Sequence, residues 1–154
     1  MDPHTQTTSK AARRTSYVLS GLVILFLLFD GGIKLVPLDI VTEASAQLGL
    51  PTSAGFARAL GILTLIGVVL YAIPRTSVLG AILLTGYMGG AIATHLRIGS
   101  PLFTHVLFGF YLGVLIWGGL YLRDERVRQL IPFRRQVRRA ARMSAVALRS
   151  DQRG

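Results

Sequence analysis

The chain has 154 residues, of which 51% are hydrophobic and only 16% are charged, whereas soluble domains carry about 25% charged residues. Lys and Arg number 17 against 7 Asp and Glu, so the net charge is +10. This composition is typical of a small membrane protein with several spans, and it excludes disordered chains and free nucleic-acid-binding domains. The chain has no cysteine, which excludes disulfides, Fe–S clusters and Cys-ligated metals within it.

Four apolar segments reach the length of about 20 residues that a membrane helix needs. We expect the four spans at residues 17–36, 53–73, 77–96 and 101–122. The second span ends at Pro74, because proline cannot continue the helical hydrogen bonds. Ser100 and Pro101 predict an N-cap and a first helical position for the fourth span. Short connections make neighbouring spans antiparallel, so the predicted fold is an all-α integral membrane four-helix bundle.

The first connection, residues 37–52, is longer than the other two. Asp39 there is a candidate cap of a short helix that ends near Leu48, with Gly49 as its stop. The apolar residues of this segment suit a membrane surface. We therefore predict a short interfacial helix in the first external loop.

Residues 1–16 form a basic N-terminus, and residues 123–154 form a basic tail. With four spans, both termini and the second connection share one side, which holds fourteen Lys and Arg residues against three on the other side. Basic residues stay in the cytoplasm, so we predict that both termini are cytoplasmic. The first span is expected to remain as an uncleaved signal anchor, because no A-x-A cleavage pattern follows it.

The tail carries ten arginines between Arg123 and Arg153. A basic segment next to a span is attracted to anionic lipid by about 1 kcal/mol per basic residue near the surface. We expect anionic lipid, and no nucleic acid, as the partner of this tail.

Two pairs of glycines recur at a spacing of four residues in the last two spans. Gly86 and Gly90 lie in the third span, and Gly109 and Gly113 lie in the fourth. Membrane helices associate through such small residues. We expect these glycine faces to pack against each other, and the alternative is a homodimer seam.

Each predicted span carries an ionisable residue in its outer third. These residues are Asp30, Lys34, Arg58, His95 and His105. A charge within the bilayer costs at least about 2.5–3.5 kcal/mol, so Asp30 should face the bundle interior and pair with Lys34 or Arg58. Because the five residues share one depth, we interpret them as lining an outer-facing polar pocket for a small ligand's head group.

The loop residues Asp39 and Glu43 are candidates for a lid over this pocket. Tyr87, Thr94 and Thr104 are further polar residues near it. Simpler interpretations remain open: the basic residues reach the lipid head groups, Asp30 and Arg58 form a structural pair, and the histidines make interfacial hydrogen bonds. His95 and His105 flank a tight turn, so we expect neither haem nor a metal site.

The run LRIGSPLFTHVLF at residues 96–108, followed by YLG at 111–113 and WGGLYLRD at 117–124, resembles the DoxX-like family. The run DGGIKL at residues 30–35 fits the same pattern. The resemblance implies a four-helix protein of the bacterial inner membrane. The wider family includes the small membrane subunit of a thiosulfate:quinone oxidoreductase and proteins that join membrane oxidoreductase assemblies. A quinone ligand and an oxidoreductase partner, membrane-bound or soluble, are therefore implied by the resemblance, and no catalytic motif can be transferred.

Three functional hypotheses follow. The first is a non-catalytic subunit or scaffold of a membrane oxidoreductase or stress-related system, with a pocket for a quinone or a lipid head group. The second is an enzyme on a lipid-soluble substrate, with Asp30, His95 or His105 as acid or base. The third is a structural assembly factor whose polar residues fix the helix register. A co-purified ligand would separate the first two from the third.

Overall fold

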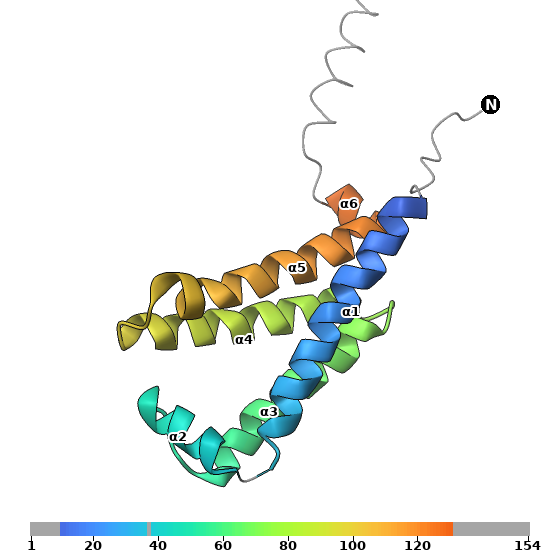
Figure 1. The fold of residues 1–154 in the computed structure, drawn as a ribbon. Helices are drawn as coiled ribbons and strands as arrows, with labels where there is room; N and C mark the ends of the chain where they lie inside the picture. Colours follow the sequence, from blue (N-terminus) through green and yellow to red (C-terminus); the bar gives the residue numbers. More distant parts are fainter. Residues whose placement is uncertain (1–9, 37, 131–154) are drawn as a thin grey trace, which may run out of the picture. The chain divides into compact units, whose positions relative to one another are not determined.

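The computed structural model describes residues 10–36 and 38–130, which fold into helices without a strand (Figure 1). The elements in chain order are α1 (Lys10–Ile33), α2 (Asp39–Gln47), α3 (Ala54–Ala72), α4 (Ser77–Arg97), the π-helix η1 (Leu102–Val106), α5 (Leu107–Arg123) and α6 (Glu125–Leu130).

Four of these helical segments are long and apolar enough to cross a membrane, as the sequence predicted. They are α1, α3, α4 and the continuous stretch Leu102–Arg123 formed by η1 and α5. Helix α1 includes Lys10, Arg13 and Arg14, which precede the predicted span. The cytoplasmic side of the termini stays a prediction.

The four long helices form a ring within the unit that ends at Arg123. Helix α1 packs against α3 and α5, and α4 packs against the same two helices. Figure 1 shows that α1 and α3 diverge from α4 and α5 toward the end that carries α2 and η1. We call this the open end, and we call the opposite end, where α1 begins and α5 finishes, the closed end.

Glycines allow two close contacts between helices, one at the closed end and one nearer the open end. A Cβ at Gly80 of α4 would overlap the backbone nitrogen of Tyr71 and the carbonyl carbon of Leu70 on α3. Nearer the open end, a Cβ at Gly61 would lie 2.7 Å from the carbonyl oxygen of Gly31 on α1. The helices approach this closely because these positions carry no side chain.

Contrary to expectation, the two predicted glycine pairs do not pack against each other. Gly109 does contact α4, since a Cβ there would lie 2.9 Å from a side-chain carbon of Ile92. At Gly86, Gly90 and Gly113, no described atom beyond the glycine's own stretch of helix lies within 4 Å of a Cβ position. A spacing of four residues places two glycines on one helical face, but it does not determine which neighbour that face meets.

A buried hydrogen-bond network joins three helices at the closed end. The Tyr71 hydroxyl, whose residue is fully buried, donates to the Ile116 carbonyl at 2.9 Å and therefore accepts from the Ser20 hydroxyl at 3.0 Å. Ser16 donates to the Gly119 carbonyl at 2.8 Å. Arg123 donates to the Tyr71 carbonyl, and its guanidinium carbon lies 4.7 Å from the centre of the Tyr71 ring. The polar atoms of this network are thus satisfied within the protein.

The second unit begins at Asp124, and its described part is Asp124 and α6. The Asp124 carboxylate accepts from the backbone nitrogen of Arg126 at the start of α6, and Arg128 pairs with Glu125. The predicted N-terminal segment up to residue 9, and the tail from residue 131 with most of its arginines, lie outside the described residues. The expected contact of the tail with anionic lipid stays a prediction.

Candidate functional site

A cavity of about 710 Å³ opens among the helices of the open end. All four long helices, α2 and η1 contribute to its wall. Most of the wall is apolar, and the rings of Phe26 and Phe108 meet there edge to face, with centroids 5.3 Å apart. The polar side chains on the wall come from Asp30, Lys34, Ser45, Tyr87, Thr94, His95 and His105.

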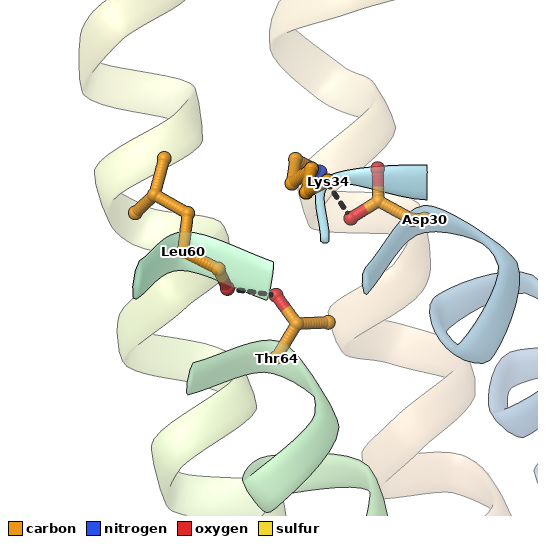
Figure 2. Close-up of polar contacts among 4 residues, drawn as sticks. All are labelled: Asp30, Lys34, Leu60 and Thr64. Carbon is orange, nitrogen blue, oxygen red and sulfur yellow. Dashed lines mark hydrogen bonds and ion pairs between the residues drawn. The ribbon is translucent and has the colours of Figure 1, made fainter. Parts of the chain in front are cut away.

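Asp30 and Lys34 form an ion pair on the wall, with the Lys34 Nζ 2.5 Å from an Asp30 carboxylate oxygen. The two side chains keep 29% and 20% of their surface exposed, respectively, so the pair is largely removed from solvent. Figure 2 shows both residues near α3, where the Thr64 hydroxyl donates to the Leu60 carbonyl of its own helix. Lys34 also lies 5.9 Å from the centre of the Tyr87 ring. Asp30 therefore finds its cation four residues along the chain, just past the end of its own helix.

His95 and His105 lie side by side on the cavity wall, with ring centroids 5.4 Å apart. Nδ1 of His95 is 3.0 Å from the Ser100 hydroxyl, and Nδ1 of His105 is 2.8 Å from the Thr104 hydroxyl. Within the described part of the chain, neither Nε2 has a hydrogen-bond partner. One nitrogen of each ring thus stays available to a ligand as a donor or an acceptor.

The turn that carries His105 is a π-helix, a form that recurs at functional sites. Pro101 is its N-cap residue, and the Pro101 carbonyl accepts from the backbone nitrogens of His105 and Val106. The prediction that Ser100 caps this helix is wrong. The Ser100 side chain orients His95 instead.

Arg58 does not line the cavity. It is exposed, and its Nε donates to the Leu35 carbonyl beyond the end of α1 at 3.3 Å. Its neighbour Phe56 does line the cavity, and two residues along a helix differ by about 200° in direction. The depth of Arg58 was thus a misleading signal, since depth does not specify the face.

Helix α2 lies along the cavity as part of its wall. Its Ile40, Val41 and Ala44 line the cavity, whereas Asp39 and Glu43 are exposed and do not. Asp39 is also the first helical residue, and its predicted place as N-cap belongs to Leu38. The predicted stop at Gly49 is confirmed, since Gly49 has a φ of 62° in the left-handed region that favours glycine.

The far end of α2 is held by Arg97, the last residue of α4. The Arg97 guanidinium donates to the Leu48 carbonyl at 2.7 Å and to the Gly49 carbonyl at 3.4 Å. Since Arg97 ends α4 and α2 follows α1, this contact connects the two diverging sides of the open end. A helix C-terminus attracts such a cation because its last carbonyls lack partners.

The arrangement suits an amphiphilic ligand better than a metal ion. Across residues 10–36 and 38–130, no three His, Cys, Asp or Glu side chains gather as a metal site would require. A cavity with apolar walls and a few polar groups is the usual form of a small-molecule site. The apolar part of a ligand would contact the walls, and its polar head would meet the histidines and the ion pair.

No curated protein sequence and no solved structure matches this chain. The model of the DoxX-like family matches residues 18–119, a stretch that covers more than half of the chain and contains all four long helices in whole or in large part. The match agrees with the resemblance drawn from the sequence. On this ground, the chain belongs to the DoxX-like family.

Proposed function

We propose that this multi-pass membrane protein of the DoxX-like family is a non-catalytic subunit or scaffold of a membrane oxidoreductase or stress-related system. The system lies in the bacterial inner membrane. The cavity of the protein holds a quinone or a lipid. The cavity is the observation that supports a bound ligand. Its volume of about 710 Å³ falls within the range of about 300–1,000 Å³ of small-molecule sites. The family resemblance supports the oxidoreductase setting.

An amphiphile fits the distribution of polar groups on the wall. The ion pair and the two histidines all belong to the end regions of α1, α4 and η1, whereas Leu27, Met88 and Leu112 contribute only apolar surface. A head group would be recognised near these polar residues, and a tail would replace lipid against the apolar ones. The predicted topology turns this end to the outer face of the membrane.

The non-catalytic role is supported by the state of the side chains. The Asp30 carboxylate is held by Lys34, so the acid best placed for proton transfer is already an ion-pair partner. The chain has no cysteine and so offers no thiol for redox chemistry. Electrons would therefore pass through a bound quinone or a partner protein, and not through the side chains.

The test is native mass spectrometry of the protein purified in mild detergent, with extraction and identification of bound lipid and quinone. Gly90→Leu should narrow the cavity, because Gly90 lines it and has open space at its Cβ position. Gly113→Leu is the matched control, since Gly113 also has open space but lies outside the cavity wall.

We expect one bound ligand per chain in the wild type and in Gly113→Leu, and at least about a tenfold lower occupancy in Gly90→Leu, which corresponds to about 1.4 kcal/mol. Thermal unfolding of the two variants should be similar. An empty wild-type protein, or a ligand retained equally in both variants, would contradict the proposal.

A further inference from the structure

We infer that the cavity selects a ligand with an uncharged head group that carries carbonyl or hydroxyl oxygens, and that it rejects anionic phospholipid. This inference rests on the proposed function, since it narrows the class of amphiphile that the same cavity takes. It follows from the hydrogen-bond and ion-pair partners that the ionisable residues at the open end already have.

The cavity offers no free cation to an anionic head group. Lys34 is the only lysine or arginine among the described residues of the wall, and Asp30 already neutralises it at 2.5 Å. Arg58 and Arg97 lie off the wall and donate to backbone carbonyls. A phosphate in the cavity would therefore lose its hydration without gaining a counterion, which is costly in an apolar site.

The cavity likewise offers no free anion to a cationic head group. Asp30 is the one acidic residue on the wall within the described range, and Lys34 occupies it. The acidic residues Asp39 and Glu43 of α2 are exposed and lie outside the wall. A choline or ethanolamine group would lack a partner for its charge, so the wall is electrostatically balanced before any ligand enters.

The groups left for a ligand are suited to neutral oxygens. The hydroxyls of Ser45 and Thr94 donate to carbonyls of their own helices, and the Nδ1 atoms of both histidines are bonded to hydroxyls. Within the described part of the chain, this leaves Nε2 of His95 and of His105, each able to give or accept one hydrogen bond, and the hydroxyl of Tyr87. Two neighbouring imidazoles can thus recognise an oxygen of a carbonyl or hydroxyl without any charge on the head.

The test compares lipids that share their acyl chains and differ in the head. The wild-type protein is placed in nanodiscs with equal amounts of diacylglycerol and phosphatidylglycerol, and, in a separate arm, with a quinone in place of diacylglycerol. Bound species are then counted by native mass spectrometry. We expect diacylglycerol or the quinone to be favoured over phosphatidylglycerol by at least tenfold. The two arms distinguish a neutral lipid from a quinone as the source of the uncharged head.

Asp30→Asn should reverse this preference, because it leaves the Lys34 ammonium without its counterion. Phosphatidylglycerol should then gain at least tenfold in occupancy relative to the wild type. Glu43→Gln is the matched control, since it removes the same charge from the exposed face of α2, and we expect no gain there.

The experiment separates a failure of the inferred uncharged head group from a failure of the proposed function. A wild-type protein that prefers phosphatidylglycerol would overturn the inference of an uncharged head while leaving a ligand in the cavity. A wild-type protein that holds none of the three probes would overturn the proposed function itself. If Asp30→Asn does not fold, the wild-type competition still decides the question.

Discussion

The two ends of the ring of helices use glycine and tyrosine differently: the helices pack closely at the closed end and surround a cavity at the open end. At the closed end, Gly80 brings α4 onto the backbone of α3, and the Tyr71 hydroxyl is enclosed among hydrogen-bond partners. At the open end, Gly86 and Gly90 have empty space beside them, and Tyr87 lies on a cavity wall. Gly80 therefore allows α4 to contact α3 at the closed end, whereas Gly86 and Gly90 leave volume at the open end.

This difference shows how a small bundle can keep a cavity. Helices in a membrane gain little from the hydrophobic effect and depend on close packing and hydrogen bonds. The closed end supplies both, through Gly80, Gly119 and the bonds of Tyr71 and Ser16. The open end can then hold its helices apart, because its stability is provided elsewhere.

The largest effect is expected from Gly80→Ala, which places a methyl group against the backbone of Tyr71. Backbone atoms cannot move aside as a flexible side chain can, so α3 and α4 must separate. Overpacking costs about 1–3 kcal/mol, and occasionally more, and we expect the upper end of this range or a failure to fold. Thermal or denaturant unfolding in detergent measures it.

Gly86→Ala is the control for this substitution, because it is the same change on the same helix at a position where the Cβ meets no described atom of another element within 4 Å. It should alter the unfolding free energy by less than about 0.5 kcal/mol or raise it slightly, since alanine favours a helix more than glycine. Equal effects of the two variants would remove the contrast between the closed and open ends.

A smaller effect is expected from Tyr71→Phe. The substitution leaves the Ile116 carbonyl and the Ser20 hydroxyl without their partner, and an unsatisfied buried polar group costs about 1–3 kcal/mol. The unfolding free energy should fall by about 1–2 kcal/mol at unchanged ligand occupancy. Tyr17→Phe, whose residue is 61% exposed, should change neither quantity. Loss of the ligand in Tyr71→Phe would mean that the two ends are coupled.

The sequence was sufficient for the fold class because membrane spans depend on local composition. Length and apolarity located all four spans, and Pro74 lies in the connection between α3 and α4, as expected. Helix α1 already includes Lys10, before the predicted span, since hydropathy marks the membrane boundary and not the end of the helix.

The candidate site was only partly predictable, because the depth of a residue along its span does not determine the direction in which its side chain points around the helix axis. Asp30 and Lys34, four residues apart, had to share a face, and they do pair. Arg58 lies at a suitable depth along its span, but its side chain points toward the Leu35 carbonyl and donates to it. Phe56, Leu60 and Leu63 recur at helical spacing on the cavity side of α3. This periodicity could have indicated that Arg58 lies off that side, had the cavity been known.

The closed end escaped prediction for a different reason. The partners of Tyr71 are Ser20 and Ile116, which are far apart in the sequence and meet only once the order of helices around the ring is set. Nothing in the spacing of these residues determines that order. The same holds for Gly31 and Gly61, which carry no four-residue pattern together.

The smallest effect is expected from Arg97→Gln at the open end. It weakens the bonds from Arg97 to the carbonyls of Leu48 and Gly49, and Arg97 is exposed, so the unfolding free energy should fall by less than about 1 kcal/mol. Amide hydrogen exchange, however, reports local opening, and exchange in α2 should become several-fold faster. Arg75→Gln, at the closed-end turn, should leave α2 unchanged. If α2 exchanges equally in both variants, Arg97 does not hold it, and the wall that α2 contributes to the cavity depends on its contact with α3.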